Sequence, residues 1–397
     1  MIFSSTKVPH QPTAFGDLGV NIKLTSEQVS EQAGFRSFVN EEIVPLADQY
    51  DREERVPFHL IEKIAERGYL GAVIPKEYGG SGMNMVTFGL LNEEFGRGCS
   101  SLRSLLTVHT MVAHTILRWG TKQHKDQWVA RLASGERIAA FGLTEANIGS
   151  DARNVETSAT ASGDSYVLNG RKKWITFGQA ADLFLIFTQC DGGPTAFLVE
   201  RENPGISVKP ITNLLGTRAS MLAELSLEDC RVSKESMIGK PGFAFSHIAL
   251  SALDCGRYSV AWGCVGLAQA CLEASVRYAT QRKQFGAFLI DHQLIQQMVS
   301  NMITNVKAAR LLCLHAGCLK DIGDPVAIME TSIAKYFASV TASKASSDAV
   351  QIHGANGCGG EYSVQRYFRD ARIMEIIEGS TQMQQINIAR YCHQEYL

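Results

Sequence analysis

The stretch that decides the fold lies in the middle of the chain, at Ala161–Gly178, and runs ASGDSYVLNGRKKWITFG. Its Tyr166–Leu168 segment favours a strand and is followed directly by Asn169-Gly170. An Asn-Gly pair between two apolar runs is the strongest short signal for a hairpin turn, so a β-hairpin is predicted there. β-branched and aromatic residues alternate from about 137 to 232, which predicts a β domain at the centre of the chain.

Both flanks of this β domain show apolar residues at helical spacing. Upstream helices are predicted at 26–54, with an N-cap around Ser26, and at 57–67, 86–95, 102–119 and 123–134. Downstream helices are predicted at 249–279, 293–319, 327–350 and 363–389, the last interrupted near Gly379. Further strands are predicted at 183–188, 195–199 and 222–227. The pattern predicts an α+β multidomain protein: an N-terminal helical domain (1–136), a middle β domain (137–242) and a C-terminal helical bundle (243–397).

Composition narrows the possible functions. The 397 residues are 45% apolar and 20% charged, which is typical of a globular protein with a large core. A net charge of −2 argues against a broad nucleic-acid-binding face. The ten cysteines form no CxxC pair and are typical of a reducing compartment. No apolar run reaches membrane-spanning length, and the first 17 residues lack signal-peptide or transit-peptide features, so we expect a cytoplasmic protein.

The common catalytic and nucleotide-binding motifs are absent from the sequence. It contains no GxxxxGK[ST] loop, no GxGxxG after a strand, no HExxH and no GxSxG. His109 and His114 are five residues apart, which is off one helical face, so no metal site is expected. A nucleotide cofactor, if one is used, is therefore not expected in a Rossmann crevice.

Two segments of the β region carry residues suited to ligand binding. In the first, 141–151, backbone N–H groups and the hydroxyls of Thr144 and Ser150 suit a polar ligand; the alternative is a plain turn. In the second, 172–176, Trp174 is either the partner of a flat heteroaromatic ring or an ordinary buried strand residue.

Three further segments lie in the C-terminal helical region. Arg282, in RKQFG at 282–286, is either a phosphate ligand or a basic residue at a helix end. The glycine-containing 351–357 segment permits close approach by a ligand or a second subunit, or is a simple turn. Glu378, after two isoleucines and before Gly379, suits a general base with a raised pKa if it is buried; otherwise it is an exposed residue beside a helix kink.

Taken in order, and together with PKEYGG at 75–80 and YFRDARI at 367–373, these segments resemble the acyl-CoA dehydrogenase family from about residue 27 to 390. The resemblance implies the three-part fold of that family, with a middle β-barrel or sandwich domain and a C-terminal four-helix bundle. It also implies FAD in the cleft between the middle and C-terminal domains, no metal, and a homo-oligomer that is a dimer or a dimer of dimers.

The resemblance assigns roles to individual residues. The FAD contacts it implies are Phe141, Leu143, Thr144, Gly149, Ser150, Trp174, Ile175, Thr176, Arg282, Phe285, Gln293, Gln351, Ile352, Gly354, Ala355, Thr381 and Gln382. Arg282, Phe285 and the 351–355 loop look like the part that reaches FAD in a neighbouring subunit. Glu378 matches the base that removes the α-proton of an acyl thioester while the β-hydride passes to flavin N5. The substrate contacts it implies are Ser150, Asp254, Arg257, Ile377 and Gly379.

Arg103 and His109 lie on the helix expected to line the acyl pocket. Because an unpaired charge is costly to bury, either they face solvent or the substrate is small and polar, with Arg103 among its contacts. The runs at 101–109, 256–266 and 369–380 resemble the family branch that oxidises groups held on acyl or peptidyl carrier proteins, in the biosynthesis of hydroxy- and methoxymalonyl extender units. We therefore expect a carrier protein as partner, and oxygen or an electron-transfer flavoprotein as electron acceptor.

Three alternatives remain open from the sequence. The first is a short-chain acyl-CoA dehydrogenase of catabolism, and the second is a carrier-bound aminoacyl oxidase acting on a prolyl-type thioester. The third is a non-enzymatic protein of this fold that binds nucleic acid or serves as an interaction module. The net charge of −2 and the intact Glu378 argue against the third.

Overall fold

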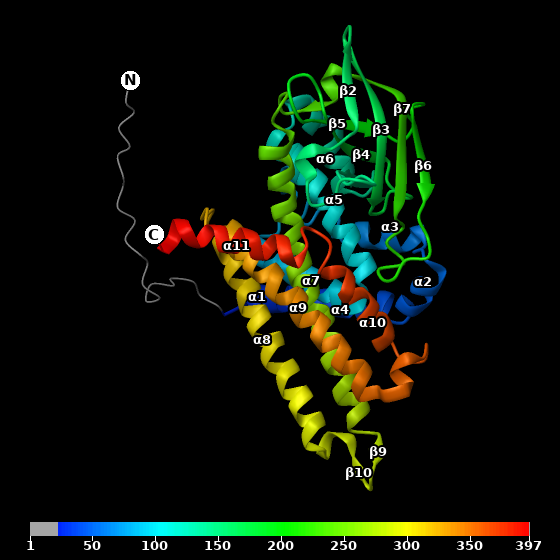
Figure 1. The fold of residues 1–397 in the computed structure, drawn as a ribbon, viewed down its shortest axis with the longest axis vertical. Coiled ribbons are helices and arrows are strands. Elements are labelled where there is room, and N and C mark those ends of the chain that lie inside the picture. The colour runs from blue at the N-terminus through cyan, green and yellow to red at the C-terminus, as the bar shows by residue number, and fades with distance from the viewer. Residues whose placement is uncertain (1–22, 397) are drawn as a thin grey trace.

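The computed structural model describes residues 23–396, with side chains placed through residue 391. Helices of the first third and the last third enclose one end of the molecule, and two sheets form the other end (Figure 1). This is the α+β arrangement predicted from the sequence, and the helical, β and helical order is confirmed.

From residue 23 on, the N-terminal part contains six α-helices. They are α1 (Ser26–Phe38), α2 (Ala47–Glu53), α3 (Phe58–Glu66), α4 (Met85–Gly98), α5 (Ser100–Trp119) and α6 (Lys122–Ala133). The predicted run over 26–54 is not one helix, because a π-helical turn at Val39–Ile43 precedes Pro45 and separates α1 from α2. The predicted N-cap is also displaced by one residue. Thr25 forms a capping box with Gln28, so Ser26 is the first helical residue.

The middle part contains two four-stranded sheets. Their strands are β1 (Ala139–Gly142), β2 (Ser158–Ser162), β3 (Ser165–Ile175), β4 (Leu183–Thr188), β5 (Thr195–Glu200), β6 (Ile206–Pro210), β7 (Ala223–Ser233) and β8 (Met237–Ile238). The strand orders are β1-β4-β5-β8 and β2-β3-β7-β6, and β1 and β4 are the parallel pair. Leu168, Phe184, Phe197 and Leu225 are among the buried residues that pack the two sheets together.

The hairpin predicted at Asn169-Gly170 is wrong. The turn lies at Gly163-Asp164, between β2 and β3, whereas Asn169 and Gly170 lie inside β3 at a register shift against β7. The Asn169 amide bonds to Asp229 on β7, both through the Asp229 carboxylate (3.3 Å) and through its backbone N–H (2.8 Å). These side-chain contacts form a bulge where the local sequence favoured a turn.

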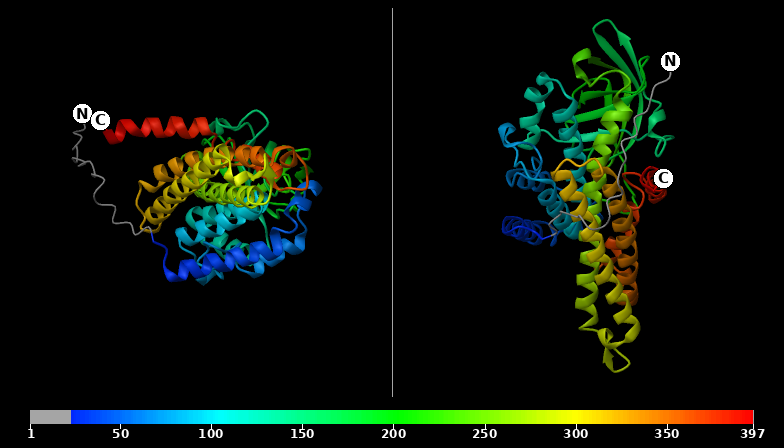
Figure 2. Two further views of the ribbon diagram at one scale, coloured as in Figure 1. Left: turned by 90° about the horizontal axis from the view of Figure 1, so that it is seen from below. Right: turned by 90° about the vertical axis from the view of Figure 1, so that its left-hand side faces the viewer.

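The C-terminal part is a bundle of long helices. They are α7 (Leu250–Ala279), α8 (Gln293–Asp321), α9 (Ala327–His353), α10 (Val364–Met374) and α11 (Thr381–Tyr396), with the small strands β9 (Lys283–Gln284) and β10 (Ala287–Phe288) between α7 and α8. Figure 2 shows α7, α8 and α9 running side by side, with the β9–β10 hairpin at the end far from the sheets.

Helix α7 is the central helix of the protein. With the turn before it, Ala244–Ala279 is long and apolar enough to cross a membrane by length and composition, and 72% of its most apolar window is buried inside the protein. It packs against α4, α5, α8 and α9.

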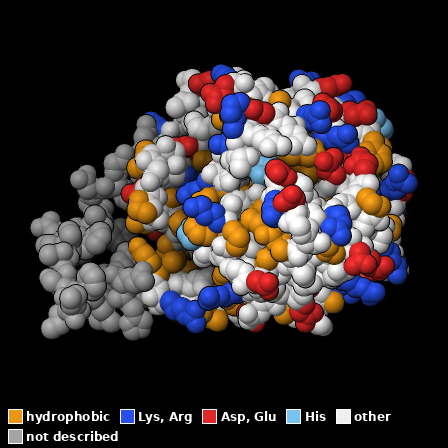
Figure 3. All heavy atoms as spheres, turned by 90° about the horizontal axis from the view of Figure 1, so that it is seen from above, with side chains coloured by type: hydrophobic (Ala, Val, Ile, Leu, Met, Phe, Trp, Pro, Cys, Tyr) orange, Lys and Arg blue, Asp and Glu red, His pale blue; other side chains and the backbone are white. Residues whose placement is uncertain are grey.

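Figure 3 shows the end of the molecule that the sheets form, opposite the β9–β10 hairpin. Acidic and basic side chains are interspersed over this surface.

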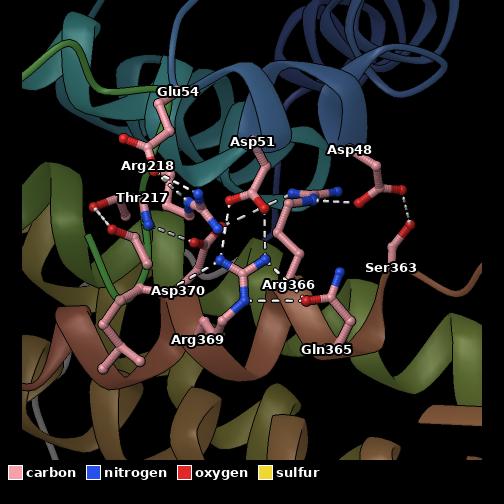
Figure 4. Close-up of polar contacts among 12 residues, drawn as sticks. Asp48, Asp51, Glu54, Thr217, Arg218, Ser363, Gln365, Arg366, Arg369 and Asp370 are labelled. Carbon is pink, nitrogen blue, oxygen red and sulfur yellow. Dashed lines mark hydrogen bonds and ion pairs between the residues drawn. The ribbon is translucent and has the colours of Figure 1, made fainter. Parts of the chain in front are cut away.

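A charged network connects α2 to α10 (Figure 4). Asp48 accepts hydrogen bonds from Arg366 Nε (2.7 Å) and Ser363 Oγ (2.6 Å), and Asp51 receives both terminal nitrogens of Arg369 (3.1 and 2.5 Å). Because two parallel N–H bonds fix a guanidinium in direction as well as in distance, this contact sets the angle between the two helices.

The same network reaches the loop before β7. Glu54 accepts a hydrogen bond from Arg218 Nε (3.0 Å), and Asp370 accepts one from the backbone N–H of Thr217 (2.6 Å). The three parts of the chain therefore meet at α10, and four residues later the chain reaches Glu378.

We expect Asp51→Asn to lower the free energy of unfolding by about 2–3 kcal/mol, because Arg369 would lose its ionic partner in a largely buried setting. Chemical denaturation measures this. Asp126→Asn is the control, since its pair with Lys122 is exposed and should change stability by less than about 0.5 kcal/mol. Equal effects of the two variants would show that the network does not hold α2 to α10.

Candidate active site

Glu378 lies in the short loop between α10 and α11, next to the first third of α7 at Gly256 and Arg257. Its backbone is left-handed (φ 55°), as is that of Gly379 (φ 86°). A non-glycine residue pays about 1–2 kcal/mol for this conformation. The turn therefore persists only because the surrounding structure holds it.

Three side chains from three helices hold the backbone carbonyls of this turn. Arg257 Nε on α7 donates to the Glu378 carbonyl (3.1 Å), and Lys335 Nζ on α9 donates to the Gly379 carbonyl (2.8 Å). Gln384 Nε2 on α11 donates to both carbonyls, at 3.1 and 3.2 Å. The direction of the Glu378 side chain is thus set by contacts far apart in the sequence.

The Glu378 carboxylate is shielded from water by the helices around it. Its Oε2 is buried and has no hydrogen-bond partner among the described residues. Burial raises the pKa of Glu378 to about 7, although Arg257, Lys335 and Arg103 act to lower it. Gly256 on α7 makes room for this carboxylate, since a Cβ there would collide with Oε2. A carboxylate with a pKa near neutrality and a free oxygen is suited to accept a proton.

Arg103 on α5 lies deep in the same region, with a side chain that is 1% exposed. It donates to Thr107 Oγ1 (2.7 Å) and contacts Met374 Sδ (3.6 Å), while its Nε has no partner among the side chains that the structure describes. No carboxylate forms an ion pair with it among residues 23–391. The alternative in which Arg103 faces solvent is therefore wrong.

Two glycines of α7 give the spacing between Arg103 and Glu378. Gly263 lies against Arg103, where a Cβ would meet its Cδ at 2.6 Å, and Gly256 lies against Glu378. Seven residues separate them, which is about 10 Å along a helix. The two charged groups thus bracket a short stretch of α7.

A chain of hydrogen bonds fixes the end of the Arg103 side chain through its terminal nitrogen Nη1. Thr107 Oγ1 bonds to Ser259 Oγ (2.6 Å), and Ser259 donates to Asn92 Oδ1 (2.6 Å). Asn92 in turn donates to the Phe88 carbonyl (2.8 Å). Because these groups are satisfied by one another, Arg103 Nε remains the unpaired donor of the cluster.

The other residues expected at the substrate have different surroundings. Asp254 pairs with Lys320 (2.5 Å), and its buried Oδ1 has no partner within the described part of the chain, so it does not pair with Arg257. His109 is remote from this cluster, since its Nε2 donates to the Leu132 carbonyl (3.0 Å) and its Nδ1 accepts from Ala139 N–H (3.2 Å). Burial lowers the pKa of His109 to about 4, so it is neutral and joins α5, α6 and β1.

A buried ion pair connects the two segments expected to contact a flavin. Glu145, in the loop after β1, pairs with Lys172 on β3 (2.6 Å), and both side chains are almost fully buried. Glu145 also accepts from Thr157 N–H (2.9 Å), and Lys173 N–H donates to the Thr144 carbonyl (2.9 Å). Burial lowers the pKa of Lys172 to about 8, although its bonds to Glu145 oppose the change. The 143–151 loop and the end of β3 therefore form one unit.

Trp174 stands at the end of this unit with 48% of its surface exposed, while Ile175 beside it is buried. The expectation of an ordinary buried strand tryptophan is therefore wrong. Its backbone has φ 62°, at a register shift in β3. The exposed ring follows Lys173, whose N–H binds the Thr144 carbonyl, and precedes the hydroxyl-bearing Thr176 by two residues. An exposed aromatic ring with polar groups close by in the chain fits a flavin, so the residues present suit FAD.

The remaining expected cofactor contacts fall into two places. Phe141 is on β1, Leu143, Thr144, Gly149 and Ser150 follow it, and Thr381 and Gln382 open α11. Arg282, Phe285, Gln293, Gln351, Ile352, Gly354 and Ala355 lie at the far end of the bundle, around the β9–β10 hairpin and the end of α9. Gly256 and Ala279 are 23 residues apart on α7, which is about 35 Å. One chain therefore does not bring both groups to one ligand.

Sequence patterns missed four residues of the site: Glu145, Lys172, Lys335 and Gln384. Lys335 had a usable signal, because it is a lysine among the apolar residues of α9. Lys172 had none, because it stands between Arg171 and Lys173 in the sequence. Glu145 and Gln384 carry no such mark, since polar residues in loops and on an outer helix are ordinary. The expectation that Glu378 might be exposed beside a kink is wrong.

Three domain families match this chain. They are the acyl-CoA dehydrogenase N-terminal domain over residues 25–136, the middle domain over 140–230 and the C-terminal domain over 246–392. The chain is 39% identical to the mitochondrial short-chain specific acyl-CoA dehydrogenase of Rattus norvegicus, covering 91% of this chain and 89% of that protein. It is 38% identical to the glutaryl-CoA dehydrogenase of Desulfococcus multivorans, covering 93% and 97%.

Solved structures show the same similarity. A glutaryl-CoA dehydrogenase of Mycobacterium smegmatis in complex with FADH2 matches with a TM-score of 0.89 and 30% identity over 93% of this chain and 95% of that one. The prolyl acyl carrier protein oxidase AnaB gives 0.88 and 28%, over 93% and 99%. FkbI, from biosynthesis of a methoxymalonyl extender unit, gives 0.83 and 31%, over 92% and 99%.

We expect Lys172→Met to weaken FAD retention about tenfold or more, because Glu145 would be left buried without its cation and the loop would lose its tie to β3. FAD per chain after gel filtration, and a fluorescence titration of the apoprotein, measure this. Arg171→Met is the matched control, one residue earlier on the same strand but exposed. Retention equal to that of the parent protein would exclude a role for the pair in flavin binding.

Proposed function

Because this chain belongs to the acyl-CoA dehydrogenase family, we propose that it oxidises a small acyl thioester with a polar or anionic far end, held on an acyl or peptidyl carrier protein. The family is FAD-dependent and acts on the CH–CH bond of acyl thioesters, so the enzyme is an oxidoreductase. The observation that carries the finer proposal is the buried guanidinium of Arg103, which has no carboxylate partner and a free Nε among the described residues.

The energetic cost of burying Arg103 supports a polar acyl group as the substrate. A buried cation without a carboxylate partner is costly, and the cost is recovered when an anionic ligand binds beside it. Its free Nε is about 10 Å along α7 from the Glu378 position, so a short acyl group spans the gap. An apolar fatty chain would leave this donor without a partner.

The carrier tether rests on sequence and similarity. The chain resembles the carrier-protein branch at 101–109, 256–266 and 369–380, and two structures of carrier-related enzymes match over most of its length. The relatives at 38–39% identity favour a second candidate, a dehydrogenase that takes short or dicarboxylic acyl groups on CoA. Arg103 is consistent with both candidates, because it would contact the acyl group and not the CoA or carrier protein that holds it.

The chemistry of the chain's own residues centres on Glu378. Its carboxylate removes the α-proton of the thioester, and the left-handed turn holds it in one direction for that transfer. Arg257, Lys335 and Arg103 stabilise the negative charge of the ionised base. Trp174, Thr176 and the 143–151 loop would hold FAD, which when bound supplies the acceptor for the electron pair.

The quaternary arrangement is part of this proposal. The Phe285 ring is 99% exposed at the tip of the β9–β10 hairpin, far from Trp174, which supports a homo-oligomer in which Arg282 and Phe285 complete the FAD site of a neighbouring chain. We also propose a cytoplasmic location, with oxygen or an electron-transfer flavoprotein as electron acceptor; the rate of reoxidation in air separates the two acceptors.

Anaerobic flavin bleaching tests the proposed substrate. Glutaryl and pentanoyl groups, equal in length but different in charge, are each offered on CoA and on a phosphopantetheinylated carrier protein. We expect the glutaryl carrier thioester to bleach the flavin fastest. Bleaching by CoA thioesters alone would support the second candidate, a dehydrogenase of acyl-CoA catabolism. No bleaching by any thioester would overturn the proposed function.

We expect Arg103→Met to slow bleaching by glutaryl thioesters about 100-fold and to change the pentanoyl rate less than about threefold, because one buried charge pair is lost. Arg118→Met is the control, an exposed arginine near the end of the same helix. Equal losses with both acyl groups would place Arg103 outside the acyl pocket.

The rate of bleaching should rise with pH through about 7, because Glu378 accepts a proton only when ionised and burial holds its pKa there. Glu378→Gln should retain FAD and lose at least about 100-fold in rate at every pH. Stopped-flow measurements from pH 5.5 to 9 give both results. Substantial turnover in this variant would show that another group is the base.

A further inference from the structure

Lys335 is a fully buried lysine in the middle of α9, with 0% of its surface exposed. Its Nζ donates to the Gly379 carbonyl at 2.8 Å, and it forms no ion pair with a carboxylate in the described part of the chain. Most lysines reach water, because burying an ammonium without an ion pair costs several kcal/mol. The cost of burying Lys335 therefore needs an explanation, and its contact with the Gly379 carbonyl provides one.

The groups facing Lys335 come from three directions. Cys264 and Arg257 lie on α7, and Glu375 and Glu378 lie at the end of α10 and in the loop after it. Burial lowers the pKa of Lys335 to about 8, and the nearby Glu378 opposes that change. Below that pH Lys335 is an ammonium, and the buried base is among the acidic groups it faces.

Lys335 differs from the two other side chains that bind the carbonyls of the Glu378 turn. Arg257 holds only the Glu378 carbonyl, and Gln384 is neutral and shared between two carbonyls. Lys335 is the cation that holds the carbonyl following the base, so it closes the left-handed turn from the α9 side. Losing it leaves Gly379 with one long, neutral bond of 3.2 Å.

We propose that Lys335 is a positioning residue for Glu378: its ammonium fixes the Gly379 carbonyl, and with it the left-handed turn that aims the carboxylate, while its charge favours the ionised base. The inference rests on the proposed role of Glu378. It adds a residue that acts through the backbone beside the base.

The electrostatic part is tested without substrate, from the pH dependence of unfolding. Because the folded pKa of Glu378 lies above its unfolded value, the free energy of unfolding falls between about pH 4.5 and 7, relative to Glu378→Gln. In Lys335→Met, compared with Lys335→Met/Glu378→Gln, this fall should extend upward by about one pH unit. Because Glu378→Gln also lowers the pKa of Lys335 in the first pair, the ionisation of Glu378 itself is followed in the parent protein and in Lys335→Met by the carboxyl infrared band that is absent from Glu378→Gln.

The positioning part is tested with whichever thioester bleaches the flavin. Lys335→Met should lower the single-turnover rate about 100-fold and change the apparent substrate Kd less than about threefold, since the base is displaced and the binding surface is not. Lys335→Gln keeps an N–H donor without the charge. Its single-turnover rate should therefore approach that of the parent protein, while the pH range over which its free energy of unfolding falls should match that of Lys335→Met. Lys344→Met, exposed on the same helix, should match the parent protein.

The two tests separate the inference from the proposed function. If no thioester bleaches the parent protein, the proposed function fails while the unfolding cycle still decides whether Lys335 controls Glu378. If Lys335→Met does not accumulate, Lys335→Gln provides the same cycle, because a neutral amide is cheaper to bury than an ammonium. An unchanged pH window in both variants, or rates equal to those of the parent protein, overturns the proposal.

Discussion

The burial of one carboxylate is the constraint on which the rest of the site depends. Glu378 has to lose water to act as a base near neutral pH, and desolvation alone would keep it protonated. Arg103, Arg257 and Lys335 come from α5, α7 and α9 to oppose that effect. None of these helices neighbours the base in sequence, so the ionisation of Glu378 is a property of the packed bundle, and any change in helix packing changes it.

The network at α10 explains how the bundle maintains that arrangement. Asp48 and Asp51 on α2 hold Arg366 and Arg369 on α10, whose chain then runs directly into the Glu378 turn. Asp370 ties the same helix to Thr217 of the β part. Movement of the N-terminal helices or of the sheets is therefore transmitted to the base through one short helix, which gives these distant ion pairs a role in the geometry of the site.

Periodicity predicted most of the fold, because helices as long as α7 and strands as apolar as β4 carry a repeated local signal. Ordered motifs likewise indicated Glu378 and Trp174. The Asn169-Gly170 hairpin was wrong because Asp229, sixty residues away, binds the Asn169 side chain and turns a local turn signal into a bulge. Lys335 was missed for a related reason: its apolar neighbours on α9 indicate burial, but its partner is a backbone carbonyl 44 residues later, and the sequence does not indicate that contact.

The three cations around Glu378 divide two tasks between them. Arg257 and Lys335 donate to backbone carbonyls of the turn, so they serve the base. Arg103 is the one of the three with a buried nitrogen that binds nothing among the described residues. If its partner is the acyl group, then α5 selects the substrate, while α7, α9 and α11 hold the turn that carries Glu378. Substitutions on the face of α5 that carries Arg103 would then alter selectivity, while Arg257, Lys335 and Gln384 still hold the turn that carries the base.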